Sequence, residues 1–111
     1  MGSWTVEFVS DEARAEFDTL PADVRASLGR VADLIEDYGL LGLSMPYVRH
    51  LDGKLWEMRG RGKDGIARSI YVAVQGRKVV ILRSFTKKTQ KTPPGEMAIA
   101  LKRAREKGYV A

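Results

Sequence analysis

The chain has 111 residues, of which 44% are hydrophobic, and this length allows one domain with a single modest core. It contains no cysteine, which excludes disulfides and thiolate metal sites and suits a reducing cytoplasm. No apolar run approaches the ~18 residues that a membrane span requires, and the N-terminal residues lack the basic and apolar segments of a signal peptide. We therefore expect one domain over residues 1–111, with residues 1–3 partly a cloning remnant.

The net charge of +5 is unevenly distributed along the chain. Residues 1–48 carry three basic and nine acidic side chains, whereas residues 49–91 carry twelve basic and three acidic ones. This asymmetry predicts a basic face, and in a domain with a pI near 9.7 such a face usually binds phosphate. The alternative is a solvated surface. Charge alone separates neither RNA from DNA nor binding from catalysis.

The N-terminal half predicts one strand followed by two helices. Alternating side chains over residues 4–9 are typical of a short strand, and residues 10–11 offer an N-cap for a helix that ends near Thr19. Pro21 fits the first turn of a second helix, Gly39 is a natural stop, and Gly29 inside it suggests close packing against the other helix. The apolar face of this helix comprises Val24, Leu28, Val31 and Ile35.

The C-terminal half predicts three strands and a last helix. Residues 40–52 are too apolar for a free linker and are expected to form an ordered connection. Turn residues at 60–65 and 75–76 separate three strands, and a helix begins around 92–94. The expected strands cover residues 54–59, 66–74 and 78–85. In the first of them Trp56 and Met58 are expected to face the core, as are Met97, Leu101 and Ala104 in the helix.

The predicted fold class is therefore α+β, in the order β-α-α-β-β-β-α. Consecutive strands joined by short turns indicate an antiparallel-rich sheet packed on the two N-terminal helices. We find no linker, repeat or low-complexity tract, so this is one domain.

Three motifs resemble a known family. They are Leu55-Trp-Glu-Met-Arg59, Arg68-Ser-Ile-Tyr71 and Phe85-Thr-Lys-Lys-Thr-Gln-Lys-Thr-Pro93, followed by a helix with Ala100 and Arg103. In this order and spacing, over about residues 4–105, the chain is similar to the phage-derived gp49-like branch of HigB toxins in the RelE superfamily. Members of that superfamily share a compact sheet flanked by helices, which agrees with the predicted order of elements.

The resemblance implies a type II toxin that enters the ribosomal A site on the 30S subunit and cleaves mRNA without a metal or other cofactor. In this reaction the RNA 2′-hydroxyl attacks the neighbouring phosphate. The enzyme must help remove a proton, stabilise charge on the phosphate and protonate the leaving oxygen. Arginine suits the second task because its guanidinium matches phosphate oxygens in a planar, bidentate way. A lysine among other cations has a lowered pKa and suits proton transfer.

The resemblance assigns catalytic roles to Arg68, Lys88, Lys87 and Arg59. Arg68 corresponds to the family arginine at the scissile phosphate, and it shares a strand face with apolar residues, so it must line a cleft or reach water. The further candidates for contact with RNA are Lys91, Arg83, Tyr71, Lys54 and Arg61.

Structural roles remain open for several of these residues. Arg59 has the alternative of pairing with Glu57 on its own strand, Tyr71 of packing in the core, and the lysines of forming a solvated loop. His50 is the only histidine but lies outside the motifs. The tyrosine that RelE uses in its last helix has no counterpart here, so the general base is unassigned.

The implied partners are mRNA on the ribosome and a cognate helix-turn-helix antitoxin. Operator DNA is expected to be bound only through that antitoxin, no membrane is involved, and the expected location is the cytoplasm. Two other hypotheses remain: a non-catalytic RNA- or ribosome-binding module on the same fold, and a DNA-binding repressor subunit. The latter is disfavoured because the basic residues lie on strands and loops and no recognition helix is evident.

Overall fold

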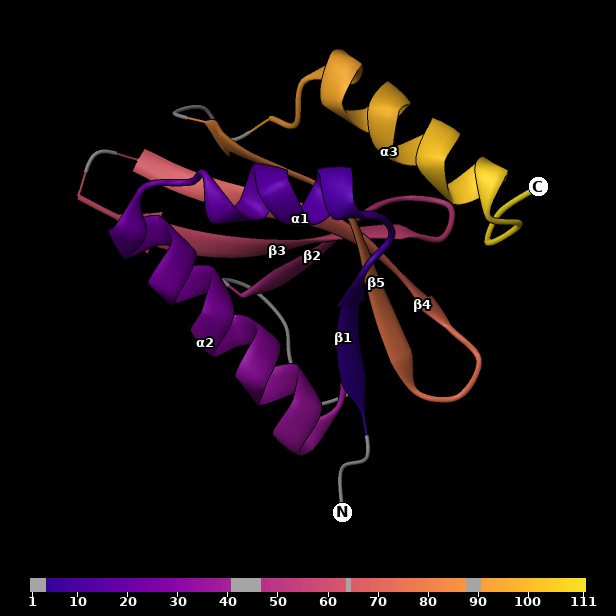
Figure 1. The fold of residues 1–111 in the computed structure, drawn as a ribbon, viewed down its shortest axis with the longest axis horizontal. Coiled ribbons are helices and arrows are strands. Elements are labelled where there is room, and N and C mark those ends of the chain that lie inside the picture. The colour runs from indigo at the N-terminus through magenta and orange to yellow at the C-terminus, as the bar shows by residue number, and fades with distance from the viewer. Residues whose placement is uncertain (1–3, 41–46, 64, 88–90) are drawn as a thin grey trace.

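The computed structural model describes residues 4–40, 47–63, 65–87 and 91–111 of the chain (Figure 1). The described part contains five strands and three helices. In chain order they are β1 (Thr5–Phe8), α1 (Asp11–Asp18), α2 (Ala22–Tyr38), β2 (Val48–Asp52), β3 (Leu55–Gly62), β4 (Gly65–Val74), β5 (Lys78–Lys87) and α3 (Pro94–Glu106).

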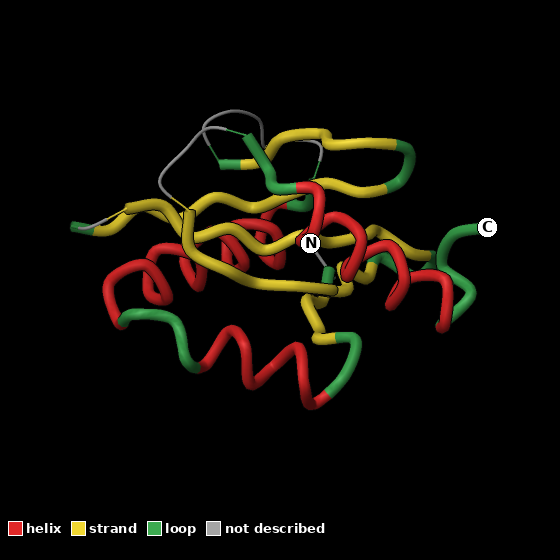
Figure 2. Tube along the Cα trace, turned by 90° about the horizontal axis from the view of Figure 1, so that it is seen from above, coloured by secondary structure: helices red, strands yellow, loops and turns green. Residues whose placement is uncertain are grey.

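All five strands form one sheet in the order β1-β5-β4-β3-β2. The pair β1–β5 is parallel, and the other three pairs are antiparallel. The strands occupy the middle of the molecule with helices around them (Figure 2). This confirms the predicted α+β class and the antiparallel-rich sheet.

The strand β2 is a correction, because the whole of residues 40–52 was expected to be a connection. Residues 48–52 instead pair with β3 at the edge of the sheet, and the register shifts between His50 and Asp52. An edge strand that is half exposed and irregular carries a weak alternating pattern, which explains why it was missed. Residues 41–46 of the expected connection lie outside the described residues.

The two faces of the sheet bury separate apolar clusters. The predicted stripe of α2 is buried on one face, against strand residues such as Met58 and Tyr71. The helix α3 packs on the other face through Ala100 and Ala104. The prediction that the sheet packs on the N-terminal helices therefore describes one face, and α3 covers the other.

Local signals in the helices are mostly confirmed. The Ser10 hydroxyl accepts a hydrogen bond from the Ala13 N–H at 3.2 Å and caps α1. Gly39 ends α2 with a φ of 79°, a conformation that side chains with a Cβ rarely adopt. Gly29 was wrongly expected to mark close packing, since a Cβ there would meet nothing within 4 Å.

The strand β3 is longer than predicted, because it runs through two glycines that were expected to form a turn. A Cβ on Gly60 would lie 2.8 Å from the backbone nitrogen of Leu28 and 2.9 Å from its Cγ. The absence of a side chain therefore lets α2 lie directly against β3. Trp56, expected in the core, is 38% exposed and packs edge-on against His50 at 5.0 Å.

We expect Gly60→Ala to lower the free energy of unfolding by about 1–3 kcal/mol, because the methyl group collides with the backbone of α2. Gly29→Ala is the matched control. It lies in the interior of α2 with open space around it, so it should raise the free energy of unfolding by up to about 1 kcal/mol. Urea unfolding of both variants measures the difference, and equal stabilities would contradict the close packing at Gly60.

Candidate functional site

Buried charges gather on the α3 face of the sheet, where β2, β3 and β4 lie side by side. The register pairs Arg49 with Glu57 and Arg59 with Arg68. Glu57 Oε1 lies 3.1 Å from Arg49 Nη2 and 3.4 Å from Arg68 Nη1. The side chains of Glu57 and Arg68 are both 0% exposed, and Arg59 is 8% exposed. We call these four residues the arginine cluster.

The arginine cluster carries more positive than negative charge. Burial lowers the pKa of Arg68, the carboxylate of Glu57 raises it, and the nearby charges of Arg59 and Arg49 lower it again. A guanidinium nevertheless stays protonated in proteins, so two cations flank the buried carboxylate and Arg59 adds a third beside Arg68. An arrangement of this kind attracts an anion, and arginine forks fit phosphate oxygens in particular.

Thr92 closes the arginine cluster from the side of α3. Its Oγ1 lies 3.4 Å from Arg68 Nη1 and 3.3 Å from Glu57 Oε2. Hydrogen bonds of this length are weak. Thr92 therefore lies next to Arg68, and its hydrogen bonds to Arg68 and Glu57 are weak.

The structure brings together two of the four predicted catalytic residues. Arg59 and Arg68 are direct neighbours across β3 and β4. The backbone of Lys87 pairs with Ile66, two positions along β4 from Arg68. Lys88 lies outside the described residues. The catalytic roles of these residues stay predictions.

Comparison with known proteins identifies the family of this chain. The family model described as "Phage derived protein Gp49-like (DUF891)" matches residues 15–105. The chain belongs to this family. The match confirms the resemblance to the gp49-like branch of the RelE/HigB toxins that the three motifs indicated.

A solved structure is also similar to this Gp49-like chain. It is the crystal structure of the archaeal RelE–RelB complex from Pyrococcus horikoshii OT3, with a TM-score of 0.57 and 20% sequence identity. The match covers 80% of this chain and 99% of that one. At this identity it establishes a RelE-like fold. No curated protein matches the sequence.

The candidates for contact with RNA separate into two places in the Gp49-like structure. Arg61 is exposed two positions along β3 from Arg59, and Lys91 is exposed immediately before Thr92. Lys54 lies at the opposite end of β3, five residues before Arg59, or about 16 Å along the strand. Lys54 nevertheless lines a pocket together with Thr92, the residue that contacts Arg68 and Glu57.

The positions of Tyr71 and Arg83 do not favour the contacts with RNA that were predicted for them. Tyr71 is 1% exposed beneath α2, and burial raises the pKa of its hydroxyl. It lies on the opposite face of β4 from Arg68, so it serves the core. The Arg83 side chain is 24% exposed and donates to Glu16 at 2.7 Å and to Glu96 at 2.6 Å. Two carboxylates neutralise the charge of Arg83, so we do not expect this side chain to bind a phosphate.

A network of ion pairs ties α1 to α3. Arg103 contacts both carboxylate oxygens of Glu16 at 2.8 Å and donates to the carbonyl of Leu82 at 2.7 Å. Leu82 is the extra residue at a bulge in β5, where the register with β4 shifts. Arg103, one of the residues that carry the family resemblance, is thus placed in a structural role.

The same network makes part of the stability depend on pH. Burial raises the pKa of Glu16, but hydrogen bonds and charge from Arg103 and Arg83 lower it by more, to below its ordinary value of 4.5. The folded pKa is depressed, so this contribution is fully present above about pH 4.5 and is lost as the pH falls through the folded pKa.

We expect Glu16→Gln to destabilise the protein by about 1–3 kcal/mol at pH 7, because it weakens charged hydrogen bonds to two arginines. The difference from the unchanged protein should shrink steadily between pH 5 and pH 3, since the native carboxyl is then protonated as well. Urea unfolding at a series of pH values provides the measurement. A difference that persists unchanged at pH 3 would contradict the role of the Glu16 charge.

Sequence reasoning missed three residues of the site. Arg49 fell in the segment expected to be a connection, and Thr92 was treated only as the start of a helix. Glu57 was considered only as a partner for Arg59 on the same strand, whereas it is buried and bonded to Arg49 and Arg68. The sequence offered one signal for the position of Glu57. This residue lies in the same strand motif as Arg59, and the neighbouring strand has Arg68 at the position that pairs with Arg59.

Proposed function

We propose that this Gp49-like protein is the toxin of a type II toxin–antitoxin system and cleaves mRNA in the ribosomal A site as a metal-independent endoribonuclease. The observation that carries the proposal is the arginine cluster, in which Arg49 and Arg68 flank the buried Glu57 carboxylate and Arg59 lies beside Arg68. The excess of cationic charge suits a phosphate group, and the family match supports RNA as its source.

In the proposed reaction a ribose 2′-hydroxyl loses its proton to water, and its oxygen forms a bond to the adjacent phosphorus. The bond from phosphorus to the 5′-oxygen of the next nucleotide breaks, and that oxygen takes up a proton. Negative charge accumulates on the phosphoryl oxygens in the transition state, where preorganised guanidinium groups stabilise it. Glu57 fixes the orientation of Arg68 and Arg49 and is a positioning residue in this scheme.

Thr92 has a defined part in this proposal. Arg68 is 0% exposed and its Nη1 lies 3.4 Å from the Thr92 hydroxyl, so a phosphate that binds Nη1 has to displace this hydroxyl. Because the hydrogen bonds of Thr92 are weak, moving its hydroxyl costs little free energy. The phosphate then takes the position of the hydroxyl. Arg59 and the exposed Lys91 contact the RNA at the rim of the cluster.

The proposed partners are the translating ribosome and an antitoxin. The structurally similar RelE was crystallised in complex with RelB, which supports an antitoxin partner here. For a Gp49-like chain we propose a helix-turn-helix antitoxin that also carries any contact with operator DNA. Among the described residues no helix is long and apolar enough to cross a membrane. Action on ribosomes places the proposed site of action in the cytoplasm.

Expression in cells followed by mapping of mRNA 5′ ends tests this function. The expected result is new 5′ ends at positions phased with codons, within translated regions only, together with arrested growth. Purified ribosomes programmed with a defined mRNA should reproduce the same cuts. Intact mRNA and normal growth at high expression would overturn the proposal and favour a non-catalytic ribosome-binding module.

A further inference from the structure

A groove of about 740 Å³ lies between α3 and the turn that joins β2 to β3, and we call it the α3 groove. Its floor is apolar, because Leu55 of β3 belongs to one hydrophobic cluster with Met97 and Leu101 of α3. The volume lies within the range of ligand pockets, which are mostly apolar with a few polar groups. The α3 groove is therefore large enough for a nucleotide of a longer strand.

One stripe of α3 forms a wall of the α3 groove. Pro94, Ala98, Leu101 and Arg105 follow one another at spacings of four, three and four, which places them on one side of the helix. Ala98 in the middle of this stripe is exposed. A ligand in the α3 groove therefore contacts α3 along several turns.

The rim of the α3 groove carries more positive than negative charge. Lys54 and Arg105 line it and are exposed, and Asp52 is the one acidic side chain among the lining residues. Arg105 also donates through its Nε to the main-chain oxygen of Ala111 at 3.0 Å. A rim of this composition favours an anionic ligand.

The α3 groove meets the arginine cluster at Thr92. This residue lines the groove, and its Oγ1 lies 3.4 Å from Arg68 Nη1. Leu55 on the floor lies two positions before Glu57 on β3, so the two side chains share a face and their Cα atoms lie about 7 Å apart. A ligand in the α3 groove is therefore a direct neighbour of a phosphate bound at Arg68.

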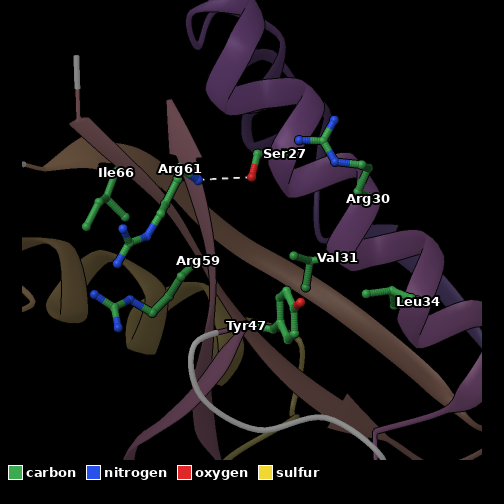
Figure 3. Close-up of a pocket in the computed structure, with 8 residues that line it drawn as sticks. All are labelled: Ser27, Arg30, Val31, Leu34, Tyr47, Arg59, Arg61 and Ile66. Atoms are coloured by element: carbon green, nitrogen blue, oxygen red, sulfur yellow. Dashed lines mark hydrogen bonds between the residues drawn. The ribbon is translucent and has the colours of Figure 1, made fainter. Parts of the chain in front are cut away.

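The α3 groove and the arginine cluster lie on the same face of the sheet. A Cβ on Gly60 would point at Leu28 of α2 on the other face. Arg59 and Arg61 flank this glycine on β3 and therefore project from the face that α3 covers. Figure 3 shows both arginines on the far side of β3 from Val31 of α2. The space beside α2 is thus separate from the arginine cluster, whereas the α3 groove adjoins it.

We propose that the α3 groove is the subsite for a nucleotide next to the cleaved bond, in which the base lies on Met97 and Leu101 while Lys54 binds a phosphate of the same strand. The inference rests on the proposed function for the source of the RNA. Apolar side chains hold unstacked bases in the pockets of enzymes that act on nucleic acids, and a methionine thioether makes favourable contacts with aromatic rings. The cationic rim and the junction with Arg68 favour RNA over a protein segment as the occupant.

The first test measures binding apart from cleavage. Fluorescently labelled single-stranded RNA tetranucleotides with 2′-O-methyl groups lack the attacking hydroxyl and stay intact on the purified protein. Ala98→Glu places a carboxylate in the α3 groove and is expected to weaken their binding by about 10-fold or more, because it repels the phosphates. Ala26→Glu makes the same change at an exposed position of α2 on the other face of the sheet. This matched control should bind within about two-fold of the unchanged protein.

Substitutions of Met97 test the contact with the base without a change of charge. Met97→Ala is expected to weaken binding about 3- to 10-fold, whereas Met97→Leu keeps the apolar bulk and should bind within about two-fold of the unchanged protein. Met97 also packs against the buried cluster under α3, so thermal unfolding of both variants checks the fold. Ala98→Glu, at an exposed position, tests the α3 groove independently of that packing.

Salt dependence tests the contact of Lys54 with a phosphate. Lys54→Gln should lower the slope of log K against log salt by about 0.7, the effect of losing one phosphate contact to a single strand. Lys102→Gln removes an exposed lysine on the side of α3 that faces α1 and should leave the slope unchanged. Equal slopes for the two variants would contradict the contact.

Photo-crosslinking locates the RNA on the protein. A tetranucleotide that contains 4-thiouridine is irradiated on the unchanged protein, which is then digested with trypsin. The expected cross-link lies in the peptide of residues 92–102, which carries the lining residues of α3 between two lysines. Cross-links found only in peptides of α2 would overturn the subsite.

The outcomes separate this inference from the proposed function. If the unchanged protein cuts mRNA on ribosomes but Ala98→Glu and Met97→Ala bind the tetranucleotides normally, the subsite is overturned and the function stands. If binding depends on both positions and no mRNA is cut, the function fails and the α3 groove stands as an RNA-binding site. No binding by the unchanged protein overturns the subsite. So does a loss on Ala98→Glu that affects only the complex with an antitoxin, since the α3 groove is then a protein interface.

Discussion

Replacing Arg68 with glutamine should lower the rate of mRNA cleavage on programmed ribosomes by about 100- to 1,000-fold, the usual effect of removing one preorganised donor to a transition-state anion. Arg68 is the most deeply buried cation of the arginine cluster, and burial strengthens its interaction with a phosphoryl oxygen. Arg68→Lys keeps the charge but loses the planar fork, so it should retain an intermediate rate. Single-turnover cleavage of a defined mRNA provides the measurement.

The same substitution should leave the fold intact. Glu57 keeps its contact with Arg49 at 3.1 Å, and the glutamine amide is able to donate to the carboxylate. Thermal unfolding of Arg68→Gln checks this, with Arg77→Gln as the control for the loss of a distant arginine. A folded Arg68→Gln protein that cuts mRNA at an unchanged rate would exclude Arg68 from the reaction.

Elements with a strong local pattern were predictable from the sequence. The stripe of α2 repeats at helical spacing, and all four of its predicted residues are buried. The N-cap at Ser10 and the stop at Gly39 also depend only on neighbouring residues. The strand β2 has no such signal, because it lies at the edge of the sheet and its pairing with β3 is not visible in its own residues.

The alternation of side chains along β3 correctly predicted which residues share a face. It did not predict how deeply each of these side chains is buried. Met58 is buried on the α2 face, whereas Trp56 on the same face is 38% exposed. Glu57 was predicted only to share a face with Arg59, and that face is the one that α3 covers. A strand face that carries charged residues is still buried when oppositely charged residues of other strands pair with them. Arg49 and Arg68 do so here from two other strands.

The candidate site was predictable only in part for the same reason. The motifs identified Arg59 and Arg68, and the register of β3 and β4 places these two side by side. Whether an arginine faces a carboxylate depends on contacts between distant segments. Arg83 meets Glu16, which is 67 residues away in the sequence, and so its predicted contact with RNA had no basis in the strand pattern alone.

Replacing Glu57 with alanine should lower the free energy of unfolding by about 3–5 kcal/mol, because it leaves buried guanidinium charge without its carboxylate. Arg68 is 0% exposed and has little freedom to reach water, whereas Arg49 is 33% exposed and is able to do so. The matched control is Glu7→Ala, which breaks an exposed pair with Lys78 at 3.6 Å and should cost less than about 1 kcal/mol. Urea unfolding with linear extrapolation measures both.

The double variant Glu57→Leu with Arg68→Met distinguishes stability from function at this position. Removing both buried charges and filling their space with apolar side chains is often neutral or stabilising, so it should recover most of the stability lost in Glu57→Ala. The recovered protein should still fail to cut mRNA, because the guanidinium at the phosphate is gone. A double variant as unstable as Glu57→Ala would show that the charge pair itself stabilises the fold. A double variant that cuts mRNA would exclude the cluster as the active site. The expected result, a stable and inactive protein, would mean that a buried ion pair of this kind is retained for its chemistry, at little or no benefit to the fold.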